Sequence, residues 1–128
     1  MTRHDPAWLH WLLVSRGGFT LEARSGRPVR DGFAVCAAPA ETFCCRLEEW
    51  NGIDVERWIH RRRPHLTSGA IHLGGWLEPS GNVSLDLVNV VPQHERERAM
   101  TIGKRLGQRA IFDLRRRELV PLTNVVAR

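Results

Sequence analysis

Residues 70–91 read AIHLGGWLEPSGNVSLDLVNVV, and this stretch predicts two adjacent strands joined by a turn. Residues 70–77 and 83–91 are two mostly apolar runs of strand length. The intervening Glu-Pro-Ser-Gly-Asn at residues 78–82 is rich in turn formers, so we expect an antiparallel hairpin. Gly74 and Gly75 indicate close backbone packing, here next to Trp76. Alternation along the second strand places Val83, Leu85, Leu87 and Asn89 on one face and Ser84, Asp86, Val88 and Val90 on the other.

Shorter strands and helices are expected on both sides of this hairpin. The further strands are predicted at residues 19–23, 33–37, 42–47, 110–114 and 118–122, the last two joined as a hairpin. An N-terminal helix is expected to end at residue 16. Asp5 is its cap, Pro6 occupies its first position, and Gly17 closes it.

Two more helices are predicted from helical spacing of apolar side chains. One runs over residues 54–63, with Asp54 as its cap and Pro64 as its stop. The other runs over residues 93–106, with Gly107 closing it. The fold class expected is therefore α+β, a single small domain over residues 1–128 with a mainly antiparallel sheet and two or three helices packed on it. Its parts are the N-terminal helix in residues 1–16, an α+β body over residues 19–122, and a tail at residues 123–128.

Composition excludes several classes of protein. Of the 128 residues 42% are hydrophobic, which is too many for a disordered chain. No apolar run approaches the roughly 18–20 residues needed to cross a bilayer, and His10 interrupts the N-terminal apolar run, so neither a membrane span nor a signal peptide is expected. The odd number of cysteines (Cys36, Cys44 and Cys45) is typical of reduced thiols in a cytoplasmic protein.

Motifs for cofactors and metals are missing from the sequence. The Gly-Gly pairs belong to neither a phosphate-binding loop nor a dinucleotide-binding pattern, and the Cys and His spacings match no zinc site. We therefore expect no cofactor and no metal. The residues that could support catalysis are a group of polar side chains suited to a metal-independent ribonuclease, which needs a general base, a general acid and a cation. These candidate catalytic residues are His65, His72, Arg62, Arg63 and Thr67.

Positive charge is concentrated in two stretches. The net charge is +5, and 18 of the 19 basic side chains are arginine, a bias that a GC-rich genome also produces. Residues 57–63 carry +4, and residues 93–117, with eight basic and three acidic side chains, carry +5. Basic patches attract phosphate backbones, and arginine also binds carboxylates in a bidentate manner. The predicted binding residues are Arg61, Arg62, Arg63, Arg96, Arg105, Arg109, Arg115, Arg116 and Arg117.

Four short motifs carry a resemblance to a known group of proteins. They are GGFT at residues 17–20, LGGW at residues 73–76, LDL at residues 85–87 and GQRAIFDL at residues 107–114. Together they resemble small uncharacterised proteins of bacteriophages and other mobile elements of GC-rich bacteria, over less than half of the chain. The resemblance implies an accessory protein that acts in the cytoplasm of the host cell, and it brings no catalytic residues with it.

Two functions are compatible with these observations. The first is a non-enzymatic basic binding module that engages an acidic host protein surface, such as a defence complex, or nucleic acid. The alternative is a small ribonuclease toxin that uses the His, Arg and Thr side chains named above. Without a complete catalytic motif, the sequence favours the binding module, and it indicates no oligomeric state.

Overall fold

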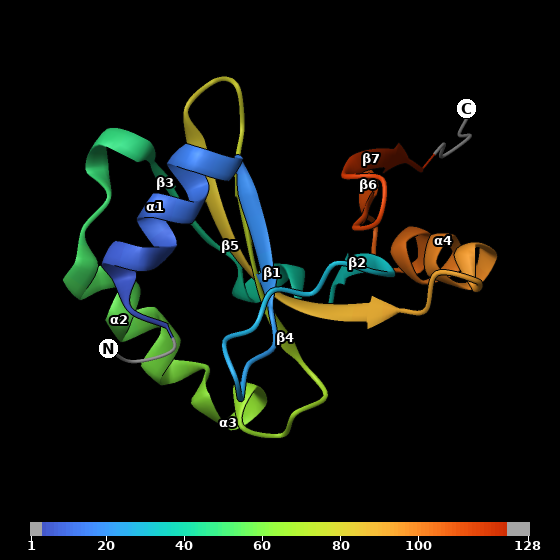
Figure 1. Ribbon diagram of the computed structural model, residues 1–128, viewed down its shortest axis with the longest axis horizontal. Helices are drawn as coiled ribbons and strands as arrows, with labels where there is room; N and C mark the ends of the chain where they lie inside the picture. Colours follow the sequence, from blue (N-terminus) through green and yellow to red (C-terminus); the bar gives the residue numbers. More distant parts are fainter. Residues whose placement is uncertain (1–3, 123–128) are drawn as a thin grey trace.

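The computed structural model describes residues 4–122 as one α+β domain with a curled antiparallel sheet (Figure 1). The strands follow the order β1-β4-β5-β2-β6-β7, and β3 pairs with β5 beside this path. Their bounds are β1 Gly18–Leu21, β2 Phe33–Cys36, β3 Phe43–Arg46, β4 His72–Leu77, β5 Asn82–Val91, β6 Ala110–Asp113 and β7 Glu118–Pro121. The predicted fold class is confirmed. The tail predicted at residues 123–128 lies outside the described residues.

Three of the helices correspond to those predicted, and a one-turn helix is added. The helices are α1 Pro6–Arg16, α2 Gly52–Arg61, α3 Arg63–Leu66 and α4 Arg96–Arg105, with 3-10 turns η1 Pro39–Glu41 and η2 Leu47–Glu49. At the start of α1 the Asp5 carboxylate accepts a hydrogen bond from the Ala7 N–H at 2.9 Å. Its end is closed by Gly17 in the left-handed conformation, with φ 79°. Both ends of α1 are therefore formed as predicted.

The second helix differs from its predicted bounds at both ends. Its cap is Asn51, whose side chain accepts hydrogen bonds from the N–H groups of Ile53 and Asp54, so the helix begins two residues before Asp54. It ends at Arg61, and Pro64 is not the stop. Pro64 lies in the first turn of α3, where its missing N–H costs no hydrogen bond.

The fourth helix begins three residues later than predicted because Gln93 has another role. The Gln93 side chain accepts a hydrogen bond from the Gly32 N–H at 2.6 Å and donates one to Asp113 at 3.0 Å. It thus joins the loop before β2 to the end of β6. Gly107, with φ 72°, follows the helix as predicted.

The β4–β5 hairpin forms as the sequence predicts, and the structure places it between β1 and β2 in the sheet. Its register pairs Leu73 with Leu87 and Trp76 with Ser84. The two glycines are packed by side chains from neighbouring strands rather than by Trp76: a Cβ at Gly74 would meet Val88, and one at Gly75 would meet the Phe19 ring. Close packing at the pair is confirmed, and its expected cause was wrong.

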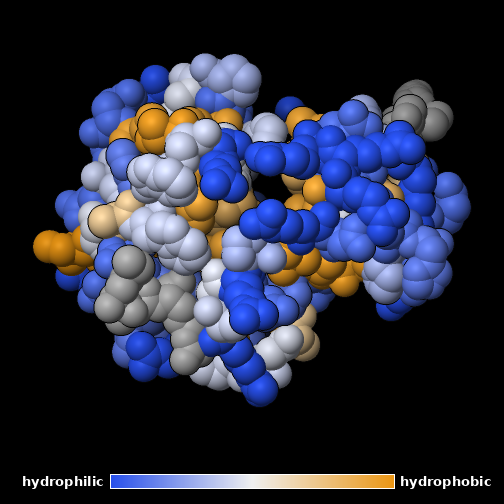
Figure 2. Space-filling model, viewed as in Figure 1, coloured by the Kyte–Doolittle hydropathy of each residue, from blue (hydrophilic) through white to orange (hydrophobic). Residues whose placement is uncertain are grey.

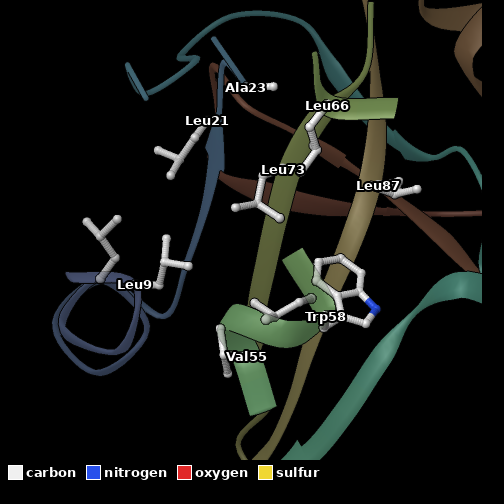
Figure 3. Close-up of a cluster of buried hydrophobic side chains, with 10 residues drawn as sticks. Leu9, Leu21, Ala23, Val55, Trp58, Leu66, Leu73 and Leu87 are labelled. Carbon is white, nitrogen blue, oxygen red and sulfur yellow. The ribbon is translucent and has the colours of Figure 1, made fainter. Parts of the chain in front are cut away.

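Two clusters of buried apolar side chains lie on the same face of β5. The larger cluster joins α1, α2, α3, β1 and β4 to the first half of β5 (Figure 3), and it contains Leu9, Leu12, Leu21, Ala23, Val55, Trp58, Leu66, Leu73, Leu85 and Leu87. The smaller joins α4, β2, β6 and β7 to the end of β5, and it contains Phe33, Val35, Val91, Ala99, Ile111, Val120 and Leu122. The helices therefore cover one face of the sheet in two groups, as Figure 1 shows.

The opposite face of the sheet is concave. The rings of Trp76 and Phe112 lie 5.8 Å apart, although β5 and β2 separate β4 from β6 in the sheet. Such a contact requires a strong curl, which brings β6 and β7 round toward the β4 end of the domain.

Candidate functional site

The turn between β6 and β7 carries three consecutive arginines with different roles. Arg115 forms a bidentate ion pair with Asp31, with Nε–Oδ1 and Nη2–Oδ2 distances of 2.6 and 3.0 Å. The Arg116 N–H donates a hydrogen bond to Asp113, and its guanidinium is exposed. Arg117 adopts the left-handed conformation, with φ 57°, which is uncommon for a residue other than glycine, asparagine or aspartate. Arg116 and Arg117 are therefore the arginines of this turn that remain available to a partner.

The basic residues of α4 are divided in the same way. The Arg96 guanidinium lies 5.8 Å from the centroid of the Phe33 ring. Arg98 is paired with Glu95 at 2.6 Å. In the part of the chain that the structure describes, Arg96 and five further cations of this region have no carboxylate within ion-pair distance. Those five are Lys104, Arg105, Arg109, Arg116 and Arg117, and none of them lies over an aromatic ring of the described residues.

We call these five cations the hairpin surface, because they lie on the β6–β7 hairpin or on the end of α4 that leads into it. Arg109 immediately precedes β6, and its carbonyl accepts a hydrogen bond from Leu122 just after β7. Arg116 and Arg117 lie at the other end, and strands of four residues separate the two groups by roughly 13 Å. In Figure 2 hydrophilic side chains gather over the part of the molecule that contains α4, β6 and β7. The predicted basic stretch is thus two groups of charge held apart by one hairpin.

A buried carboxylate supports the turn of this hairpin. Asp113 is 1% exposed and accepts hydrogen bonds from the Gln93 amide and the Arg116 N–H, each at 3.0 Å. Burial alone raises the pKa of Asp113, but these hydrogen bonds and the nearby Arg116 charge outweigh it, so the pKa lies below its ordinary value. Asp113 therefore stabilises the turn in its ionised form.

The GQRAIFDL motif has a structural explanation. The Gln108 side chain donates a hydrogen bond to the Cys36 carbonyl at 2.6 Å and accepts one from the Cys36 N–H at 3.3 Å. Gln108 thereby extends the hydrogen bonding along β2 past the first residue of β6. Two of the three polar residues of the motif, Gln108 and Asp113, hold the hairpin in place.

The three arginines at residues 61–63 point to different places. Arg62 is 19% exposed, its Nε lies 2.8 Å from the Glu41 carboxylate, and its guanidinium lies 5.3 Å from the Trp58 ring centroid. Arg61 is exposed on α2. Arg63 lines an open groove beside α3. Arg62 is therefore a structural residue that ties η1 to α2, whereas the predicted roles of Arg61 and Arg63 in binding stay predictions.

The groove beside α3 has a volume of about 1110 Å³ and is formed by four segments, one of which is His4 before α1. Helix α2 contributes one face with i, i+3, i+4, i+7 spacing, made of Ile53, Glu56, Arg57 and His60. The loop after β1 contributes Ala23 and Arg24, and α3 with its C-cap contributes Arg63, Leu66 and Thr67. We call this site the α2–α3 groove.

Two arginines of this groove were missed by the sequence-based selection of binding residues. Helical spacing from Ile53 would have found Arg57. Arg24 could not be found this way, because it is 43 residues from Thr67, to whose carbonyl its Nε and Nη2 donate hydrogen bonds at 3.3 and 3.1 Å.

The candidate residues for a nuclease are not gathered at one place. Arg63 and Thr67 line the groove, but the Thr67 hydroxyl donates a hydrogen bond to the Arg63 carbonyl at 3.0 Å. His65 is exposed on α3 and is not among the lining residues. His72 begins β4, and its buried Nδ1 has no hydrogen-bond partner among the described residues. Of the predicted catalytic group, the groove therefore gathers Arg63 and Thr67 but not Arg62, His65 or His72.

A second group of polar side chains, Cys36, Thr42 and Asp86, lies where the chain passes from β2 to β3 beside β5. The Thr42 hydroxyl donates a hydrogen bond to Asp86 at 2.8 Å, and the Cys36 thiol lies 4.0 Å from the same carboxylate. Burial raises the pKa of Cys36, and the Asp86 charge raises it further. A thiol held in its protonated form is a poor nucleophile, so this group does not resemble an activated cysteine.

Metal binding and membrane insertion were searched for in residues 4–122. No group of three or more His, Cys, Asp or Glu side chains there is arranged to hold a metal ion. Nor does this part of the chain contain a helix with the length and apolar character to span a bilayer.

Comparison of the chain with protein-family models, with curated proteins and with solved structures gave no match.

Proposed function

We propose that this protein is a non-enzymatic module that binds the phosphate backbone of nucleic acid through the hairpin surface. The observation that carries the proposal is the set of five cations there, none of which is paired with a carboxylate among the described residues. Free guanidinium and ammonium groups replace the counterions of a phosphate backbone, and this exchange supplies most of the affinity of sequence-independent binding.

The conformation of Arg117 supports the same proposal. A left-handed arginine costs about 1 kcal/mol or more relative to glycine at the same position. Backbone strain of this kind is common at functional sites. A side chain kept at such a position, on an exposed turn directly after two other arginines, suits a role in contact with a ligand.

The origin of the protein belongs to this proposal as well. The resemblance of the motifs to phage and mobile-element proteins would make it an accessory protein acting in the host cytoplasm. An acidic surface of a host protein, such as a defence complex, is then the other class of partner that the hairpin surface could engage. The ribonuclease alternative has less support, because His65 and His72 do not line the groove that Arg63 and Thr67 line.

The test is a titration of labelled, mixed-sequence duplex DNA and single-stranded RNA with the protein, followed by fluorescence anisotropy between about 50 and 200 mM salt. The variant combines Arg116→Gln with Arg117→Gly, and the matched control is Arg57→Gln in the α2–α3 groove. Replacing Arg117 with glycine also removes the backbone strain, so the variant is expected to fold.

We expect the wild type to show a steep salt dependence. The double variant should bind more weakly, and its slope of log K against log salt should be smaller by about two. The control should keep the wild-type slope. Equal binding by wild type and double variant would refute the proposal, and cleavage of the RNA, lost on His65→Ala or His72→Ala, would support the ribonuclease instead.

A further inference from the structure

The α2–α3 groove combines positive charge with exposed apolar surface. Its lining contains three arginines (Arg24, Arg57 and Arg63) against a single carboxylate, Glu56. Four apolar residues also line it: Ala23, Ile53, Ile59 and Leu66. Ala23 and Leu66 are buried, whereas Ile59 is half-buried and Ile53 is 68% exposed, so the two isoleucines supply most of the exposed apolar surface.

One cation of the groove, Arg24, is held by the residues around it. Arg24 is oriented by the Thr67 carbonyl, with which two of its nitrogens form hydrogen bonds. Gly69, with φ 81°, lies against the Arg24 guanidinium, and a Cβ there would approach Nε to 3.1 Å. Arg57 lies on the same helix face as Ile53. A partner therefore meets Arg24, which is already oriented before binding, and Ile53, which lies one helical turn from a second cation, Arg57.

This chemistry suits a protein segment better than nucleic acid. Nucleic acid that enters a groove usually stacks its bases on aromatic rings, and no Phe or Trp is among the described lining residues. An amphipathic helix binds a groove by placing apolar side chains at i, i+3, i+4 and i+7 on an apolar floor. Carboxylates beside those anchors would pair with the arginines, and such charge-assisted hydrogen bonds are strong.

We propose that the α2–α3 groove is a docking site for an acidic amphipathic segment of a partner protein. Apolar side chains of the segment cover Ile53 and the floor at Leu66, and its carboxylates pair with Arg57 and Arg63. This site is separate from the hairpin surface and does not depend on nucleic-acid binding.

The probes are synthetic helical peptides with leucine at i, i+3, i+4 and i+7 and glutamate at the flanking positions. Each is paired with a counterpart in which glutamine replaces every glutamate. Amide NMR spectra of the labelled protein report which residues the peptide contacts, and the titration reports the affinity. We expect shifts at Ile53, Arg57 and Leu66, and affinity about tenfold weaker for the glutamine counterparts.

Two variants and a matched control make the test specific. Arg57→Gln and Ile53→Ser should each weaken binding of the acidic peptides by about tenfold. Arg61→Gln is the control, because Arg61 is exposed on the same helix, outside the groove lining, and carries the same charge. Folding of each variant is checked by its NMR spectrum.

The proposal is overturned if no acidic peptide binds more tightly than its glutamine counterpart. Equal losses in Arg57→Gln and Arg61→Gln would overturn it too, because they would show attraction by net charge alone. Displacement of a bound peptide by duplex DNA, with the same amides shifted, would assign the groove to nucleic acid. Neither variant should change the salt slope measured for DNA, so this proposal and the proposed function fail independently.

Discussion

The packing of Phe19 over Gly75 predicts a strong coupling between these two residues. They lie directly opposite each other in the β1–β4 pair. A Cβ built at Gly75 would approach the Phe19 ring to well under 3.0 Å, closer than real Cβ contacts. Gly75→Ala must therefore move the ring away from the larger hydrophobic cluster, against which Phe19 packs.

The size of the effect follows from two opposing contributions. Alanine in a strand is favoured over glycine by about 0.5–1 kcal/mol, because it loses less backbone entropy on folding. Overpacking of a filled site costs about 1–3 kcal/mol. Because the Phe19 ring packs against the larger hydrophobic cluster, we expect the second contribution to dominate, and Gly75→Ala should lower the free energy of unfolding by about 1–2 kcal/mol.

Urea denaturation of a double-mutant cycle measures the coupling. In the Phe19→Ala background the ring is absent, so Gly75→Ala should become neutral or stabilising there, with a coupling energy of at least about 1 kcal/mol. Gly52→Ala is the control, because a Cβ at Gly52 would meet only Pro6, at an ordinary 3.6 Å, and the change should stabilise the protein. An equal effect of Gly75→Ala in both backgrounds would refute the assigned contact.

Three further variants test the polar interactions. Asp113→Asn should cost about 1–3 kcal/mol at neutral pH. Burial raises the pKa of Asp113, but its hydrogen bonds lower it by more, so the pKa in the folded protein lies below the unfolded-state pKa near 3.8. The ionised carboxylate therefore stabilises the fold fully above about pH 3.8, and this stabilisation is lost as the pH falls through the folded-state pKa. Denaturation at several pH values should show the difference from wild type narrowing in acid. For Asp86 the pH dependence has the opposite sign, because burial raises its pKa. Stability therefore falls as the pH rises through that pKa. Asp86→Asn should remove this fall without destabilising the protein at pH 7. Gln108→Ala should cost about 1–2 kcal/mol and speed hydrogen exchange at the Cys36 amide, and unchanged exchange there would exclude the proposed extension of β2.

The elements predicted correctly are those specified by local sequence. The β4–β5 hairpin needs only alternating apolar residues and a turn, and α1 has its cap and its closing glycine within a few residues of the helix itself. The start of α2 was wrong because Asn51 and Asp54 are both good caps. Local sequence does not distinguish them, whereas the structure uses the earlier one.

The candidate sites were less predictable because charge in the sequence does not show which cations are paired. Arg62 and Arg115 belong to the most basic stretches, yet they are held by Glu41 and Asp31, at sequence separations that no local pattern reports. Arg24 joins the α2–α3 groove only through the carbonyl of Thr67. The sequence shows which stretches are rich in arginine. Which of those arginines remain free to bind a partner depends on tertiary contacts.

The division of the core into two clusters has a consequence for local unfolding. Strand β5 is the element that contributes buried side chains to both, with Leu85 and Leu87 in the cluster of ten and Val91 in the cluster of seven. Because the smaller cluster buries fewer apolar side chains, α4, β6 and β7 are expected to open and close as a unit without the rest of the chain. Amides of β6 should then exchange with solvent faster than those of β4. The hairpin surface lies on this less stable unit, so a ligand bound there would slow exchange in β6 and β7 and leave the other half of the molecule unchanged.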